Sequence, residues 1–166
     1  MAQSPAAKSP TPNLSAGEAA PDFDMATDNN GRASLKAFKG KKVVLYFYPK
    51  DDTPGCTIEA KDFRDRMKDF EKAGAVIIGV SRDDVKSHEK FKEKFCLPFP
   101  LASDEDGTVS EAYGVWVEKS MYGKKYMGIE RATFLIDGHG KLAHVWPKVK
   151  VEGHAQEVLE TAQGLK

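Results

Sequence analysis

The chain has 166 residues, no formal net charge at pH 7 and 40% hydrophobic residues. This length suits one globular domain with a substantial core, and the balanced charge argues against nucleic acid or an anionic membrane as a partner. No apolar run is long enough to span a bilayer, and two cysteines are too few for a disulfide scaffold. We therefore expect a cytoplasmic protein, and in that reducing setting an isolated cysteine needs a chemical explanation.

The first 20 residues are rich in Ala, Pro and Ser and show no hydrophobic period. Such a composition buries too little apolar surface to offset the entropy that ordering removes. We expect a disordered tail over residues 1–20, with no assigned function, and one folded domain over residues 21–166.

Alternating strand and helix patterns follow the tail. Short strands are expected on either side of the turn at residues 28–31, and apolar runs predict buried strands over 43–48, 75–80 and 132–136, followed by a strand over 142–146. Helical periods are seen in the stripe Ala60, Phe63, Met67 and Phe70 and in the stripe Val85, His88, Phe91 and Phe95. Further helices are expected near 108–113 and over 154–165.

This order of elements predicts an α/β fold with three layers, in which helices flank a central mixed sheet. Right-handed crossovers make the first two buried strands parallel. In sheets of this kind, functional sites form where a strand ends and a helix begins.

Residues 49–57 occupy such a junction. Thr53 is a suitable N-cap and Pro54 suits the first helical position, so Cys56 becomes the third helical residue. Its sulfur would lie near unpaired backbone N–H groups and the positive end of the helix dipole, which favour the nucleophilic thiolate. Gly55 leaves room for a small substrate. The alternative is a buried structural cysteine.

The pattern Pro49-x-x-x-Thr53-x-x-Cys56 matches the peroxiredoxin signature. The chain resembles the peroxiredoxins, in particular the bacterioferritin comigratory protein or peroxiredoxin Q subfamily, over nearly everything after the tail. The segments that carry the likeness are Pro21–Phe23, Lys42–Ala60, Leu97–Asp104, Arg131–Asp137 and Trp146–Lys150. The resemblance implies a thioredoxin-like fold.

The resemblance also implies roles for single residues. Cys56 would be the peroxidatic cysteine, Thr53 would hydrogen-bond the peroxide and the sulfur, and Pro49 would shield the pocket from water. Arg131 would hold the thiolate and polarise the substrate, although a solvated arginine at a strand edge is the alternative. Glu59 either hydrogen-bonds near the site or is an ordinary exposed helix residue.

By the same resemblance, the activity is that of a thiol-dependent peroxidase. Hydrogen peroxide and organic hydroperoxides would be reduced through a Cys56 sulfenic acid, without a cofactor. Each turnover would need a thiol reductant, either thioredoxin or glutaredoxin with glutathione. The subfamily implies a monomer.

A resolving cysteine is missing from the positions at which the subfamily carries one. The position five residues after Cys56 is Lys61, and the alternative on the next helix aligns near Lys92. Cys96 is the only cysteine in that region. Either Cys96 forms a disulfide with Cys56 after local unfolding, or it packs at a buried helix end and an external thiol attacks Cys56 directly.

Other classes of function fit the sequence less well. Thr53 and Glu59 occupy the positions that a Cys-x-x-Cys motif would need, so rapid dithiol exchange is excluded. The four histidines, which could serve a Cys–His hydrolase, lie in no partner motif, and zinc-site spacing is absent. They are His88, His139, His144 and His154. The remaining alternative is a redox-responsive holdase or a non-catalytic binding module on the same scaffold.

Overall fold

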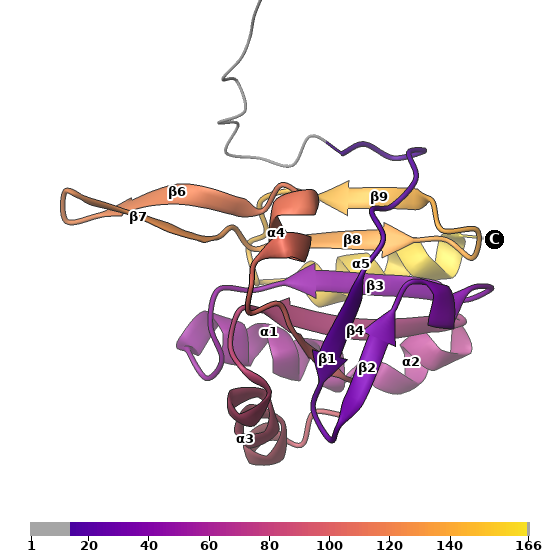
Figure 1. The fold of residues 1–166 in the computed structure, drawn as a ribbon. Coiled ribbons are helices and arrows are strands. Elements are labelled where there is room, and N and C mark those ends of the chain that lie inside the picture. Colours follow the sequence, from indigo (N-terminus) through magenta and orange to yellow (C-terminus); the bar gives the residue numbers. More distant parts are fainter. Residues whose placement is uncertain (1–13, 166) are drawn as a thin grey trace, which may run out of the picture.

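The computed structural model describes residues 14–165, so the prediction for residues 1–13 of the tail lies outside the described residues. A seven-stranded sheet has the order β2-β1-β5-β4-β3-β8-β9, and β6 pairs with β7 in a separate hairpin (Figure 1). The strands are β1 (Asp24–Thr27), β2 (Gly31–Ser34), β3 (Lys42–Phe47), β4 (Ala75–Ser81), β5 (Leu101–Ser103), β6 (Trp116–Met121), β7 (Lys124–Ile129), β8 (Ala132–Ile136) and β9 (Leu142–Trp146). The α-helices are α1 (Pro54–Arg64), α2 (Met67–Lys72), α3 (Val85–Phe95), α4 (Thr108–Ala112) and α5 (His154–Gly164), and a short 3-10 helix, η2, spans Lys36–Phe38.

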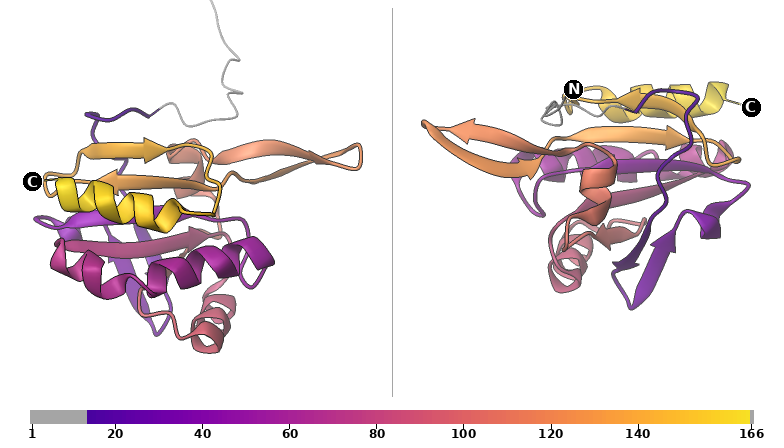
Figure 2. Two further views of the ribbon diagram at one scale, coloured as in Figure 1. Left: turned by 180° about the vertical axis from the view of Figure 1, so that it is seen from behind. Right: turned by 45° about the horizontal axis from the view of Figure 1, so that its top comes forward.

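The sheet is mixed and its centre is buried on both faces. Strands β3, β4 and β5 are parallel, as predicted for the first two buried runs, whereas β8 runs antiparallel to β3. Helices α1, α2 and α5 cover one face (Figure 2), and α4 lies against the other. On that second face the ring of Tyr113 packs against Phe47 and Phe134. The expected α/β architecture is therefore confirmed.

The predicted helical stripe that begins at Ala60 is divided between two helices. Helix α1 ends at Arg64, and α2 begins at Met67 after Arg66, whose φ of −110° and ψ of 11° depart from helical values. The apolar spacing survives the break, since the rings of Phe63 and Phe70 are both buried with centroids 5.9 Å apart. Burial of the stripe is thus maintained by two short helices rather than one.

Residues 17–20, which the prediction assigns to the tail, contact the folded domain. The N–H of Gly17 donates to the carbonyl of Leu142 at 2.7 Å, and Ala19 forms an antiparallel bridge with Lys141. Ala20 is buried. The Ala-rich composition concealed these contacts because they are made by the backbone and do not require a hydrophobic period.

The β6–β7 hairpin was not predicted from the sequence. It extends away from the body of the molecule (Figure 1), and its turn places Tyr122 and Gly123 at positive φ values of 53° and 80°. Its outer residues are exposed, so the run shows none of the regular apolar pattern that signals a buried strand. Within residues 14–165, none of the helices combines the length and apolar composition needed to cross a bilayer.

Burial of the first residue of α5 predicts a loss of stability in acid. The Nε2 atom of His154 lies 2.8 Å from Oγ1 of Thr133, and burial lowers the histidine pKa to about 4. The neutral ring therefore stabilises the fold above pH 6.5, and this contribution is lost as the pH falls from 6.5 towards 4. It amounts to about 3 kcal/mol at most.

We expect the free energy of unfolding, measured by urea titration, to fall less between pH 6.5 and 4 in His154→Gln than in the wild type. Because every other titrating group is shared, the difference between the two slopes isolates His154. Equal slopes would contradict this assignment.

Candidate active site

Cys56 is the third residue of α1, as the positions of Thr53 and Pro54 predicted. Its side chain is almost fully buried, with 2% exposed. Thr53 occupies the N-cap position, but its side chain makes no capping hydrogen bond. Instead its hydroxyl donates to the carbonyl of Lys50 at 2.9 Å. Thr53 thereby closes the loop that leads from β3 to Cys56.

Arg131 brings a positive charge to the sulfur. Its Nη2 atom lies 3.3 Å from the Sγ atom of Cys56, and its Nη1 donates to Oε1 of Glu59 at 2.6 Å. Arg131 directly precedes β8, and the register pairs Phe47 at the end of β3 with Ala132 at the start of β8. The arginine therefore lies beside the start of α1 and is not a solvated residue at a strand edge, since only 16% of its side chain is exposed.

Glu59 belongs to the site and is not an exposed helix residue. Its side chain is 1% exposed, and its Oε2 atom is buried without a hydrogen-bond partner among the described residues. Burial raises its pKa to about 7, although the charge and hydrogen bond of Arg131 act in the opposite direction. Burial lowers the pKa of Arg131, but Glu59 and Cys56 outweigh that effect and raise it. The three side chains form one coupled group.

The close approach of Arg131 explains the residue before Cys56. A Cβ atom built on Gly55 would lie 3.2 Å from Nη2 of Arg131, which is closer than most carbon contacts allow. A side chain at this position would require the guanidinium to shift by a few tenths of an ångström. Glycine at position 55 therefore lets the guanidinium lie close to the sulfur, and it also leaves room for a substrate.

A cleft of about 480 Å³ adjoins the loop that precedes α1. Pro49 is exposed and forms part of its wall. The other lining residues are Lys50, Arg82, Glu105, Trp116, Lys119, Tyr126, Met127, Gly128 and Ile129. Most of them come from the β6–β7 hairpin, so sequence reasoning, which missed the hairpin, missed this wall as well.

Lys119 links the cleft to the site. Its amine donates to the carbonyl of Ile129. Burial lowers its pKa; the nearby charge of Arg131 acts in the same sense, while Glu130 and Cys56 oppose it. Lys119 is therefore close enough to the sulfur and the guanidinium to respond to both charges.

Cys96 is exposed, so the alternative in which it packs at a buried helix end is wrong. It is the C-cap of α3 and adopts a left-handed conformation, with a φ of 53°. Nη1 of Arg64, at the end of α1, donates to the carbonyl of Phe95 at 2.9 Å. Since Cys56 and Arg64 are eight residues apart in one helix, a rise of 1.5 Å per residue separates them by about 12 Å.

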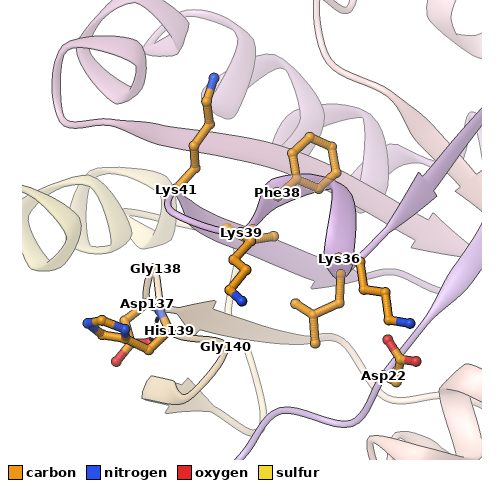
Figure 3. Close-up of a pocket in the computed structure, with 11 residues that line it drawn as sticks. Asp22, Lys36, Phe38, Lys39, Lys41, Asp137, Gly138, His139 and Gly140 are labelled. Carbon is orange, nitrogen blue, oxygen red and sulfur yellow. Dashed lines mark hydrogen bonds between the residues drawn. The ribbon is translucent and has the colours of Figure 1, made fainter.

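The histidines do not form a Cys–His pair. His88 and His154 are buried, whereas His139 and His144 are exposed, and Arg131 is the one side-chain partner of Sγ among residues 14–165. A second cavity, of about 230 Å³, lies between η2 and the β8–β9 turn (Figure 3). That turn is at the end of β8 opposite to Arg131, and the lining includes none of the predicted site residues.

A buried thiol at a helix N-terminus beside an arginine, on a mixed sheet flanked by helices, is the arrangement expected of a thioredoxin-like thiol peroxidase. The family model described as "AhpC/TSA family" matches residues 16–145, and the chain belongs to this family. Peroxiredoxin Bcp of Bacillus subtilis is 52% identical over 149 residues, which are 90% of this chain and 95% of the relative.

Solved structures agree with this assignment. Peroxiredoxin Q of Xanthomonas campestris is 46% identical, with a TM-score of 0.84 over 89% of this chain and 96% of that one. The bacterioferritin comigratory protein of the same organism, studied as trapped intermediate and ligand complexes for its alkyl peroxide reduction activity, is 45% identical. Its TM-score is 0.84 over 89% of this chain and 97% of that one. The expected family, thioredoxin-like fold and thiol peroxidase activity are confirmed.

The raised pKa of Glu59 predicts a pH-dependent effect of its replacement. Because the folded state favours the protonated acid, the wild type loses stability relative to a neutral residue as the pH rises from 4.5 to 7, by about 3 kcal/mol at most. We expect Glu59→Gln to be more stable relative to the wild type at pH 8 than at pH 5. Urea unfolding at both pH values tests this, and a pH-independent difference would contradict it.

Proposed function

We propose that Cys56 is the peroxidatic nucleophile and that Arg131, Thr53 and Pro49 complete the catalytic site. The observation that carries the proposal is the 3.3 Å contact between Nη2 of Arg131 and Sγ of Cys56 at the start of α1. A fixed guanidinium at this distance stabilises negative charge on the sulfur and remains in place while that charge moves to the substrate.

In the reaction, the Cys56 thiolate attacks one oxygen of the hydroperoxide. An S–O bond forms as the O–O bond breaks, so the sulfur is oxidised by two electrons and the peroxide is reduced. The leaving oxygen takes a proton and departs as water or an alcohol, while Cys56 becomes a sulfenic acid. Arg131 faces the charge that develops on the leaving oxygen, and the Thr53 hydroxyl, which donates its proton to Lys50, accepts a hydrogen bond from the hydroperoxide O–H.

The substrates that we propose are hydrogen peroxide and organic hydroperoxides. The cleft beside Pro49 supports the second class, because Trp116, Tyr126 and Met127 give it apolar walls large enough for an alkyl group. Alkyl peroxide reduction by the Xanthomonas campestris relative is consistent with this proposal.

A thiol must return Cys56 to its reduced state. Attack by a thiol on the sulfenic acid gives a disulfide and water, and a second thiol then releases Cys56. Cys96 could supply the first thiol only after local unfolding that brings the two cysteines together, because a disulfide needs Cα atoms within about 7 Å. We therefore favour direct attack by an external thiol, with thioredoxin, or glutaredoxin with glutathione, as the donor to a monomeric enzyme. The cytoplasm maintains such donors.

Peroxide consumption by Cys56→Ser tests the nucleophile. We expect the rate with hydrogen peroxide and with cumene hydroperoxide to fall to the uncatalysed background, because the serine hydroxyl is a far weaker nucleophile at neutral pH. Cys96→Ser is the matched control and should retain the first turnover. Activity that survives in Cys56→Ser would overturn the mechanism and favour another role, such as that of a holdase.

Intact mass spectrometry tests whether Cys96 takes part in the reaction. The reduced protein is treated with one equivalent of hydrogen peroxide, and a parallel sample contains dimedone, which traps a sulfenic acid. We expect a dimedone adduct on Cys56 and a free thiol at Cys96. A loss of about 2 Da without an adduct would instead mean that Cys96 condenses with the sulfenic acid and is a resolving residue.

A further inference from the structure

A buried, doubly hydrogen-bonded histidine lies next to the catalytic loop and has no part in the mechanism above. The side chain of His88, on α3, is 0% exposed. Its Nε2 atom lies 2.9 Å from the carbonyl oxygen of Ala102, and its Nδ1 atom lies 2.7 Å from Oδ2 of Asp51. A carbonyl and an ionised carboxylate can only accept hydrogen bonds, so with Asp51 ionised both ring nitrogens donate and the ring is an imidazolium.

The electrostatics agree with this protonation state. Burial lowers the pKa of His88, but the hydrogen bond and charge of Asp51, together with the carbonyl of Ala102, outweigh burial and raise it. Removing one partner of an ion pair that is buried in this way strongly destabilises the protein, because the remaining charge is left uncompensated. The pair is therefore a firm link between α3 and the loop that contains Asp51.

Asp51 is fixed by more than the histidine. Its carboxylate also accepts hydrogen bonds from the hydroxyls of Tyr48 at 2.6 Å and Ser87 at 2.7 Å. Its backbone N–H donates to Oδ2 of Asp83 at 2.8 Å, and the same oxygen accepts from Ser81 at 2.7 Å. The side chain and backbone of this one loop residue are thus held by Tyr48, which follows β3, by two residues of α3 and by the β4–α3 connection.

Oxygen and nitrogen atoms of Asp51, Asp83 and His88 lie within 4.8 Å of one another, which raises the question of a metal ion. A histidine ligand must present a nitrogen lone pair. Nδ1 of His88 points its proton at Asp51, and Nε2 points its proton at Ala102. The arrangement is that of a complete hydrogen-bond network rather than of a ligand set.

The position of Asp51 in the chain connects this hydrogen-bond network to the catalytic site. It lies between Pro49 and Thr53, and the Thr53 hydroxyl bonds back to Lys50 in the same loop. We propose that the His88–Asp51 pair is a positioning device, which fixes the loop from Pro49 to Thr53 against Cys56 and so sets the rate of the peroxide reaction. This inference rests on the proposed function. Neither residue contacts Sγ, so both act through the loop.

The test compares two reactions of Cys56 in a Cys96→Ser background. The second-order rate with hydrogen peroxide depends on the position of Pro49 and Thr53, whereas alkylation by iodoacetamide depends on the thiolate and on access alone. We expect Asp51→Asn and His88→Gln to slow the peroxide reaction about 10- to 100-fold, since small misplacements of catalytic groups have effects of this size. Alkylation should change less than about threefold.

Ile136→Ala is the matched control, because Ile136 is buried at the end of β8 away from Arg131, in the core cluster that does not include Cys56, so its truncation destabilises the core on the other face of the sheet. It should leave the rates of both reactions close to those of the parent. The positioning role is overturned if the rates with peroxide and with iodoacetamide fall together in Asp51→Asn and His88→Gln. It is also overturned if both rates stay within twofold of the parent.

A milder variant keeps the proposal testable if removal of the buried charge prevents folding. Ser87→Ala deletes one donor to Asp51 and leaves the ion pair intact. We expect it to slow the peroxide reaction by about threefold, with alkylation unchanged; a rate equal to that of the parent would overturn the proposal. Failure of the proposed function is distinguishable, because the parent protein itself would then not react with peroxide at Cys56.

Discussion

One largely buried guanidinium holds the site together. Arg131 donates to the sulfur of Cys56 with one nitrogen and to the carboxyl group of Glu59 with the other. Arginine suits this task because its planar fork presents several donors in fixed directions and keeps its charge at any physiological pH. Glu59 fixes the direction of the fork, and the fork in turn fixes the environment of the sulfur.

The sheet provides the geometry for this contact. Cys56 follows the end of β3 and Arg131 precedes the start of β8, and these strands are antiparallel neighbours in register. A slip of one residue would turn the side chains of β8 to the opposite face and remove the arginine from the site. The buried runs of β3 and β8, which are among the most apolar segments of the chain, therefore serve the chemistry by fixing this register.

The sequence was sufficient to predict the helices and strands whose burial leaves a continuous or periodic pattern of apolar residues. Strand β9 and helix α3 begin and end at the predicted residues, and the placement of Cys56 in α1 followed from Thr53 and Pro54. It was insufficient for contacts between distant segments. Nothing local to Glu59 indicates that it pairs with an arginine 72 residues away. Nor does the exposed β6–β7 hairpin have the apolar alternation that would have predicted the wall of the cleft.

The most direct test uses the double variant Arg131→Met and Glu59→Gln, in which no buried charge is left unpaired. The quantity measured is the rate at which the reduced protein reacts with hydrogen peroxide. We predict a fall of about 100-fold or more relative to Glu59→Gln alone, which is the size of effect that follows the loss of one donor to a developing charge. Circular dichroism would establish that both proteins are folded. A rate within about twofold of the Glu59→Gln protein would contradict the central role of Arg131 and require another source of charge stabilisation at Cys56.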